Sequence, residues 1–298
     1  MNPREYDIEP VDLSWCPGCG NFQILSALKE ALAELEIPPQ DVVLISGIGQ
    51  AAKTPHFMKG HIIQGLHGRA LPVATGVKAA NPELTVLAIG GDGDMYGEGG
   101  NHLLHTIRRN PDLTNLVHNN MVYGLTKGQA SPTSPVGLKT PIQVEGVFSE
   151  PLNPVALAIS QGASFVARTF SANTELTKEV IKAAILHKGY ALVDIFQPCV
   201  SFNKVNTYKW FRENTIVMED SPEKLRDRKR AMELALSGPP FPLGILYRDD
   251  SGRPCFEDRL QAYRRSKVPL WKRTPDLAGI AAYIETLREG ELKGGRES

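Results

Sequence analysis

Residues 84–127, LTVLAIGGDGDMYGEGGNHLLHTIRRNPDLTNLVHNNMVYGLTK, hold a short apolar run and a second expected strand, and each ends in a polar turn. Residues 84–89 form a short, mostly apolar run, which is typical of a strand buried in a parallel sheet. This run leads into a glycine-rich turn around Asp92. A segment with a helical apolar face follows, and a second strand at residues 115–118 leads into Asn119 and Asn120. The alternation predicts an α/β fold with a doubly wound, mostly parallel sheet.

Asp92 and Asn120 are both expected at the carboxyl ends of their strands. In an open α/β sheet ligands bind at that edge. A carboxylate and an amide oxygen, with glycine clearing space around them, suit a Mg²⁺ ion that keeps its other positions for water and phosphate. An EF-hand loop beginning at Asp92 is a weaker interpretation, because Tyr96 and Leu103 fall where oxygen ligands are needed.

The overall composition is that of an ordinary globular protein. Of the 298 residues, 42% are hydrophobic and 22% charged, and the formal net charge is zero, which gives no indication of nucleic-acid or anionic-membrane binding. No apolar run reaches the ~18 residues that a membrane helix needs. The polar, acidic start of the chain lacks the apolar core of a signal peptide, so we expect a cytoplasmic protein.

Four cysteines are too few for a disulfide scaffold. Cys16 and Cys19 form a CxxC pair in a glycine-rich turn, an arrangement used by zinc, by iron–sulfur clusters and by redox pairs. Cys199 follows an expected strand at residues 191–196, so it should lie at the ligand edge, within reach of the CxxC pair. Cys255 is interpreted as an isolated thiol.

Two further stretches are expected beside the ligand. An apolar strand at residues 42–46 ends in Gly47-Ile48-Gly49, although a lone GxG is a weak signal. Lys53 follows it and is as typical of a solvated surface as of a site. For His67 we weigh contact with a bound diphosphate or carboxylate equally against a packing role. The loop after Asn120 brings Leu125, Thr126 and Lys127 toward the ligand.

Several motifs in matching order resemble a known family. These are SWCPGCG, SGIG, GLHGRALPVATG, GGDGDMYGEGGN, NNMVYGLTKGQASPT and QPCVSFN. Within them, GDG followed after 25 residues by NN resembles the thiamine diphosphate motif. Together they resemble the β subunit of 2-oxoacid:ferredoxin oxidoreductases over about residues 10–215. The resemblance implies a thiamine diphosphate-binding domain at residues 1–215 with the CxxC segment at its start. Residues 216–298 would be a C-terminal extension that packs on the core or on a partner.

The resemblance also implies the reaction and its partners. The enzyme would use thiamine diphosphate and Mg²⁺ for the coenzyme A-dependent oxidative decarboxylation of a 2-oxoacid, of the 2-oxoglutarate or pyruvate class. Electrons would pass through a [4Fe-4S] cluster to ferredoxin. An α subunit would supply the glutamate that activates the cofactor, so this chain would be incomplete alone.

The site residues follow from the same motifs. Mg²⁺ would be held by Asp92, Asn120 and the carbonyl of Val122. The cofactor would be lined by Gly47, Ile48, Gly49, His67, Gly91, Asp92, Gly93, Asp94, Asn120, Val122, Gly124, Leu125 and Thr126. The residues nearest the substrate would be Lys53, His67, Leu125 and Lys127, and the cluster would be held by Cys16, Cys19 and Cys199.

One position departs from the family pattern. Gln50 stands after GIG, where a fourth cluster cysteine is expected. A different group such as Cys255 could complete the site, the cluster could have a non-thiolate ligand or a three-iron form, or it could be lost or replaced by zinc. We favour a retained cluster. Two other functions stay open: a non-oxidative thiamine diphosphate-dependent decarboxylase subunit, and a non-catalytic, zinc-stabilised assembly subunit.

Overall fold

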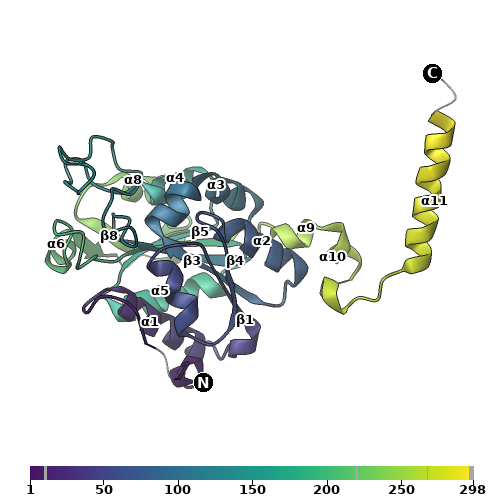
Figure 1. The fold of residues 1–298 in the computed structure, drawn as a ribbon, viewed down its shortest axis with the longest axis horizontal. Coiled ribbons are helices and arrows are strands. Elements are labelled where there is room, and N and C mark those ends of the chain that lie inside the picture. Colours follow the sequence, from purple (N-terminus) through teal and green to yellow (C-terminus); the bar gives the residue numbers. More distant parts are fainter. Residues whose placement is uncertain (10–11, 219–220, 267, 295–298) are drawn as a thin grey trace.

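The computed structural model describes residues 1–298 except 10–11, 219–220, 267 and 295–298. Its centre is an eight-stranded sheet with the order β2-β1-β3-β4-β6-β5-β8-β7 (Figure 1). The strands are β1 (Val42–Ser46), β2 (His61–Gln64), β3 (Thr85–Gly91), β4 (Leu113–Asn119), β5 (Phe165–Phe170), β6 (Tyr190–Phe196), β7 (Thr215–Val217) and β8 (Phe241–Arg248). The paired strands run parallel, except that β8 lies antiparallel to β5.

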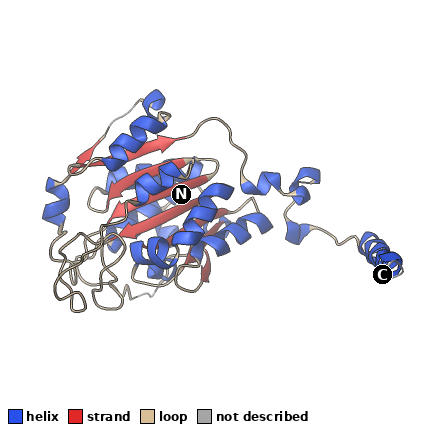
Figure 2. Ribbon diagram, turned by 90° about the horizontal axis from the view of Figure 1, so that it is seen from above, coloured by secondary structure: helices blue, strands red, loops and turns tan. Residues whose placement is uncertain are grey.

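Helices cover both faces of the sheet, which makes three layers (Figure 2). The helices are α1 (Asn21–Glu34), α2 (Ala70–Ala80), α3 (Gly100–Arg109), α4 (Pro154–Ser160), α5 (Thr174–Leu186), α6 (Tyr208–Glu213), α7 (Pro222–Leu225), α8 (Arg228–Leu236), α9 (Phe256–Arg259), α10 (Gln261–Arg265) and α11 (Leu277–Gly294). One core lies under α2, α3, α4 and α8, and the other lies under α1 and α5. In β1, Val43 and Ile45 enter the first core while Val42 and Leu44 enter the second, as the two-residue period of a strand requires. The doubly wound architecture is confirmed.

The order of the strands creates a switch point between β1 and β3. From β1 the chain moves outward to β2, returns to β3 on the other side of β1, and continues to β4 in the opposite direction. The loops after β1 and β3 therefore diverge, and a crevice opens at the carboxyl ends of these strands. That crevice is the usual ligand position in an open α/β sheet.

Part of the expected C-terminal extension belongs to the central sheet. β7 and β8 extend the sheet, and the charged segment between them forms two short helices, α7 beginning at Pro222 after Ser221 and α8 beginning at Arg228 after Asp227. Asp227 causes the division, since its side chain accepts hydrogen bonds from the backbone of Lys229 and Arg230 and caps α8. The division of the chain at residue 216 stays a prediction.

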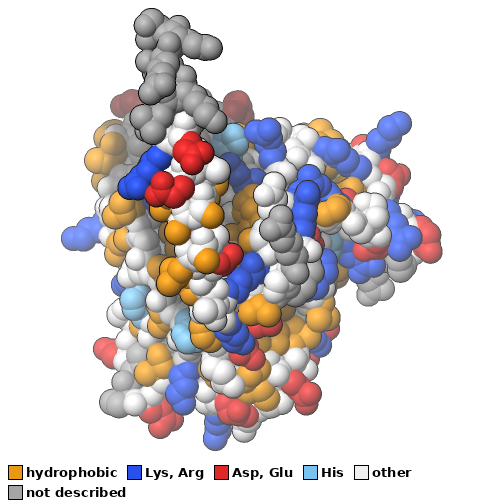
Figure 3. Space-filling model, turned by 90° about the vertical axis from the view of Figure 1, so that its right-hand side faces the viewer, with side chains coloured by type: hydrophobic (Ala, Val, Ile, Leu, Met, Phe, Trp, Pro, Cys, Tyr) orange, Lys and Arg blue, Asp and Glu red, His pale blue; other side chains and the backbone are white. Residues whose placement is uncertain are grey.

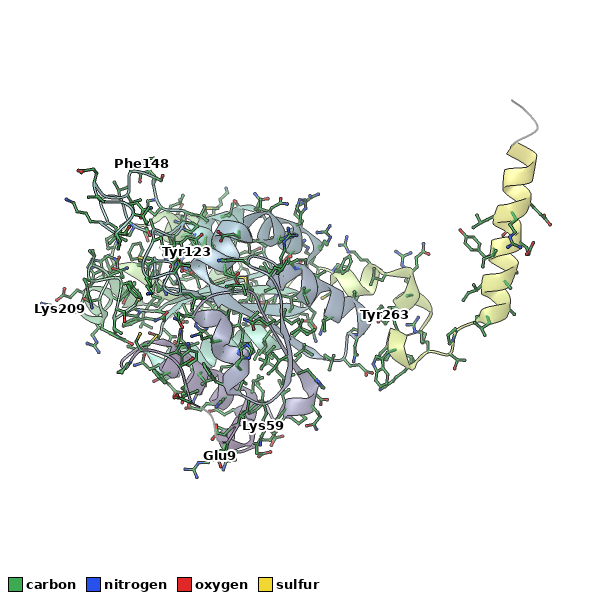
Figure 4. The ribbon with its side chains drawn as sticks, in the orientation of Figure 1. Glu9, Lys59, Tyr123, Phe148, Lys209 and Tyr263 are labelled. Carbon is green, nitrogen blue, oxygen red and sulfur yellow. The ribbon has the colours of Figure 1, made fainter. Side chains whose placement is uncertain are left out.

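Beyond β8 the chain stays packed on the body through α9 and Tyr263. Tyr263 is buried where α10 meets the body, and its hydroxyl donates a hydrogen bond to the carbonyl of Ala80 (Figure 4). Helix α11 stands apart from the sheet (Figure 1). It carries exposed apolar side chains, and Figure 3 shows such side chains along this helix: Leu277, Ile280, Tyr283, Ile284 and Leu287.

None of the helices in the described residues is long and apolar enough to cross a membrane. The cytoplasmic location stays a prediction.

Candidate active site

A pocket opens at the switch point and is lined by residues at and after the carboxyl ends of β1, β2, β3 and β4. Its lining residues are Ile48, Gly49, Gln50, Ala51, His67, Gly91, Asp92, Gly93, Asp94, Asn120, Val122, Tyr123, Gly124, Leu125 and Thr126. We call this the cofactor pocket. All but one of the thirteen residues expected to line a cofactor are in this set, although their roles as ligands stay predictions. The exception is Gly47, and Gln50, Ala51 and Tyr123 are additions.

Asp92 is buried at the base of this pocket, with 1% of its surface exposed. Its Oδ2 accepts hydrogen bonds from the hydroxyls of Ser131 at 2.5 Å and Thr133 at 2.6 Å. Burial raises the pKa of Asp92 to about 6, and the two hydroxyls act against that rise. A carboxylate held in this way is oriented before any ligand arrives. The sequence analysis did not identify Ser131 and Thr133, although their loop is rich in hydroxyl side chains.

The loop after β4 presents the second group of oxygens. Asn120 Oδ1 accepts a hydrogen bond from the backbone N–H of Val122 at 3.0 Å, and Met121 between them has φ +59°. Asn203 donates to the carbonyl of Asn120 at 3.2 Å and ties this turn to the segment after β6. Asp92, Asn120 and Val122 thus meet in one pocket.

The donors in this pocket fit Mg²⁺ better than a transition metal. Among the described residues, no three His, Cys, Asp or Glu side chains lie together as a site for a single metal ion. One carboxylate with amide and carbonyl oxygens is the kind of partial shell that Mg²⁺ completes with water and phosphate.

Asp94 connects three loops around the pocket. Its Oδ1 accepts hydrogen bonds from the backbone N–H groups of Gly68 at 2.7 Å and Ile48 at 3.2 Å. A Cβ at Gly47 would lie 2.3 Å from the Asp94 carboxylate, so glycine is required there for packing. Burial raises the pKa of Asp94. We interpret Gly47 and Asp94 as the scaffold that fixes the pocket's shape.

His67 lies at the edge of the pocket beside this scaffold. Its Nδ1 is 2.9 Å from Asp94 Oδ1 and 3.4 Å from Glu98 Oε2. The Tyr123 hydroxyl donates to Glu98 at 3.1 Å, and the centre of its ring lies 6.1 Å from the centre of the imidazole. His67 is therefore held on one side by carboxylates.

Three lining glycines leave space that no other part of the chain fills. A Cβ added at Gly49 would have no atom within 4 Å, and at Gly91 or Gly124 the nearest atoms would be 3.8 and 3.7 Å away. At Gly93, by contrast, a Cβ would come within 2.2 Å of the Tyr123 ring. Protein packing thus explains Gly93, whereas the open side of the other three fits a bound molecule.

The two lysines expected near the substrate do not line the pocket. Lys53 is in the 3₁₀ helix η3 (Ala51–Phe57), and its Nζ lies 3.4 Å from both oxygens of Ser14. Lys127 is exposed in the turn after Gly124 and has φ +75°. Leu125 and Thr126 do line the pocket, at its exposed edge.

A second pocket adjoins the first and contains three thiols. Its lining residues are Trp15, Cys16, Cys19, Asn21, Gln50, Asn120, Gly124, Gln197, Cys199, Val200, Ser201 and Phe202. We call this the thiol pocket. Gln50, Asn120 and Gly124 belong to both pockets, so the two are separated by little more than these residues.

Each thiol sulfur lies beside a hydrogen-bond donor. Ser201 Oγ is 3.1 Å from Cys16 Sγ, Gln197 Nε2 is 3.5 Å from Cys19 Sγ, and the N–H of Phe202 is 3.4 Å from Cys199 Sγ. All three cysteines are free, and burial raises the pKa of Cys19 to about 11, with Cys199 and Cys16 adding to the rise. Three sulfurs with donors aimed at them fit an iron–sulfur cluster, whose sulfurs accept such bonds.

Cys255 is far from the other cysteines. It lines a surface hollow with Ser164 and Lys188, at the amino ends of β5 and β6. Cys199 follows the carboxyl end of β6. A strand of seven residues separates the two ends, about 20 Å at ~3.3 Å per residue. The idea that Cys255 completes the thiol site is wrong for this geometry.

An oxygen-lined pocket at the switch point places a ligand site in this open α/β sheet, and comparison with known proteins identifies the class of the fold. Residues 45–195 match the family of the C-terminal thiamine pyrophosphate-binding domain of thiamine pyrophosphate enzymes. Residues 199–265 match the C-terminal region of the pyruvate ferredoxin oxidoreductase beta subunit.

Relatives define the family more closely. The chain is 43% identical over 260 residues to 2-oxoacid:ferredoxin oxidoreductase 2, subunit beta, of Aeropyrum pernix, covering 84% of each chain. It is 45% identical over 249 residues to the corresponding beta subunit of Saccharolobus solfataricus, covering 79% of this chain and 82% of the relative. The chain belongs to the family of 2-oxoacid:ferredoxin oxidoreductase β subunits, which confirms the resemblance, and it is one subunit of a multi-subunit oxidoreductase.

A solved structure has the same architecture. The 2-oxoglutarate:ferredoxin oxidoreductase from Magnetococcus marinus, with 2-oxoglutarate, coenzyme A and succinyl-CoA bound, is 37% identical and superposes with a TM-score of 0.87. The match covers 95% of this chain and 96% of the other.

Proposed function

We propose that this chain, with an α subunit, catalyses the coenzyme A-dependent oxidative decarboxylation of a 2-oxoacid of the 2-oxoglutarate or pyruvate class. The 2-oxoacid and coenzyme A give an acyl-coenzyme A, CO₂ and a proton, and two electrons go singly to two ferredoxins. The observation that carries the proposal is the contact between an oxygen-lined pocket and a thiol-lined pocket through Gln50, Asn120 and Gly124.

In the cofactor pocket, Asp92 would hold Mg²⁺ with the amide oxygen of Asn120 and the carbonyl of Val122. The hydroxyls of Ser131 and Thr133 would keep the Asp92 carboxylate in place, so little rearrangement would be needed on binding. Mg²⁺ would in turn orient the diphosphate, as it does for substrate phosphates elsewhere. Gly49, Gly91 and Gly124 would leave the volume that the cofactor fills.

Thiamine diphosphate, when bound, stabilises the carbanion that forms as CO₂ leaves. The protein's part is to position it and to exclude water. His67 is directed by Asp94 and Glu98, which face its Nδ1, so its Nε2 is the nitrogen left for the substrate. Leu125, at the exposed edge, would cover the reacting centre. Lys127 lies on the same turn, and we propose that it contacts substrate or partner there. Lys53 is directed at Ser14 and would act only after a change of rotamer.

In the thiol pocket, Cys16, Cys19 and Cys199 would hold an iron–sulfur cluster. Such a cluster accepts and passes on single electrons. Its position beside the cofactor pocket would give a short path from the substrate toward ferredoxin. Hydrogen bonds to the sulfurs from Ser201, Gln197 and Phe202 would help to set the reduction potential.

The α subunit would contribute a catalytic group to the cofactor pocket as well as a contact surface. Among the described residues that line the cofactor pocket none is glutamate, and the two aspartates are already engaged. We therefore infer that the carboxylate that activates the aminopyrimidine comes from the partner. The loop with exposed Phe148, which projects from the body in Figure 4, and exposed Ile142 and Val144 offer apolar surface for that contact.

The test is an anaerobic assay of the purified complex of both subunits. A panel of 2-oxoacids is supplied with coenzyme A and ferredoxin or a viologen dye, and acceptor reduction is followed. We expect 2-oxoglutarate or pyruvate to be the best substrate and Asp92→Ala to abolish both turnover and tight Mg²⁺–thiamine diphosphate binding. Full cofactor occupancy in Asp92→Ala would refute the assignment of the pocket.

A further inference from the structure

The thiol pocket offers three sulfurs, whereas a [4Fe-4S] cluster ordinarily takes four thiolates. The fourth cysteine of the chain, Cys255, is at the other end of the strands. This chain therefore has no fourth thiol to offer the remaining corner of a cluster.

The other polar side chains around this pocket each make at least one hydrogen bond. Ser201 donates its hydroxyl to Cys16, and Asn21 Oδ1 lies 2.8 Å from the His118 ring. Gln197 donates to Cys19 and to the Pro198 carbonyl, and its Oε1 accepts from Asn120 at 3.5 Å. None of these has a side-chain oxygen that is both buried and free.

Gln50 differs from them. Its side-chain Oε1 is buried and has no hydrogen-bond partner. Its backbone is held in place, because the Trp15 indole N–H donates to the Gln50 carbonyl at 2.8 Å. Leaving an amide oxygen buried and unpaired is unfavourable. Gln50 lines both pockets, and a cationic centre in the thiol pocket that it reached would remove that penalty.

From these observations we propose that the cluster of this chain has three thiolate ligands, and that its fourth iron faces the amide of Gln50 and is exchangeable. This inference rests on the proposed function, since it assumes that the thiol pocket holds a cluster. An amide oxygen is a hard, neutral ligand, and cluster iron prefers thiolate, so this iron is held less firmly than the other three.

Two consequences follow. One-electron oxidation by ferricyanide removes that iron, and the step balances as [4Fe-4S]²⁺ giving [3Fe-4S]⁺, Fe²⁺ and one electron. Replacing a thiolate by a neutral group also removes a negative charge from the cluster. The reduction potential is therefore higher than that of a four-thiolate site, as it is in Rieske centres.

The experiment uses the complex of both subunits, purified anaerobically as parent, Gln50→Cys and Gln50→Glu. Gln161→Cys is the control, because it adds a thiol at the exposed C-terminal end of α4, away from both pockets. Iron and sulfide are counted before and after one equivalent of ferricyanide. Electron paramagnetic resonance records the three-iron signal, and a redox titration gives the potential of each protein.

We expect the parent and the control to lose one iron in four, to gain the three-iron signal and to recover with Fe²⁺ and thiol. Gln50→Cys should keep all four irons, and both Gln50 variants should have a lower potential. Equal iron loss and equal potentials in the parent and both variants would overturn the inference. So would a parent that keeps four irons.

Failure of the inference and of the proposed function can be told apart. A parent that contains no iron but binds Mg²⁺ and thiamine diphosphate would overturn the inference and leave the cofactor pocket assigned. A parent whose cluster behaves as expected, but which reduces no acceptor with any 2-oxoacid, would support the inference and contradict the proposed reaction.

Discussion

The substitution Thr133→Val tests whether Asp92 is a metal ligand while Asp92 itself stays unchanged. Valine has nearly the shape of threonine but lacks the hydroxyl that lies 2.6 Å from Asp92 Oδ2 and 2.9 Å from Asn119 Oδ1. A hydrogen bond to a charged group contributes about 1.5–3 kcal/mol. Loss of a group that orients a metal ligand typically weakens metal binding about 10- to 100-fold. Ser131 still donates at 2.5 Å, so binding is weakened and not abolished.

The assay is calorimetric titration of the two-subunit complex with thiamine diphosphate at several Mg²⁺ concentrations. We expect Thr133→Val to require about 10 to 100 times more Mg²⁺ for the same occupancy. Thr177→Val is the matched control, because Thr177 is equally buried and its hydroxyl donates to the Phe170 carbonyl, outside the cofactor pocket. If both variants bind as the parent does, Asp92 does not carry the metal in the way described.

Three further outcomes follow from the structure. Gly124→Ala should fold normally and bind the cofactor at least tenfold more weakly, whereas Gly93→Ala should be destabilised by contact with the Tyr123 ring. Cofactor titration measures the first effect and urea denaturation the second. Unchanged cofactor affinity in Gly124→Ala would contradict the interpretation that the space beside Gly124 is filled by the cofactor. Arg168→Met should cost about 3–5 kcal/mol of unfolding free energy, because Arg168 pairs with the fully buried Asp194 at 3.4 Å, and a loss below about 1 kcal/mol in urea denaturation would show that the pair is unimportant. The isolated β chain should not turn over any 2-oxoacid in the viologen assay, and activity of the homogeneous chain would disprove the need for a partner carboxylate.

Much of the fold could be predicted because its central strands are buried on both faces. The apolar runs of β1, β3, β4 and β6 are visible in the sequence, and the polar turns after three of them indicate the ligand edge. Strand β2 was missed because it is an exposed edge strand. Strand β8 was missed because it contains a proline and pairs antiparallel with β5, a long-range choice that local pattern does not encode.

The candidate site, like the fold, could be predicted from the sequence only in part. Asp92, Asn120 and the glycines could be found because they directly follow strands. Ser131 and Thr133 could not, because their contact with Asp92 depends on how the intervening loop folds back across about 40 residues. Lys53 does not line the cofactor pocket, because η3 turns its side chain toward Ser14, and its contact with the substrate stays a prediction. Gln50 lies between the two pockets because the loop after β1 packs against the CxxC segment. The spacing of residues in the sequence does not reveal this packing.

The central claim is that electrons from a 2-oxoacid in the cofactor pocket reach the thiol pocket of this chain. A single-turnover experiment tests it most directly: the oxidised complex is mixed anaerobically with 2-oxoacid and coenzyme A, without an external acceptor, and frozen for electron paramagnetic resonance. We predict that the signal of a reduced cluster appears in the parent and is absent in Asp92→Ala. Release of CO₂ without any change in the cluster signal would contradict the claim.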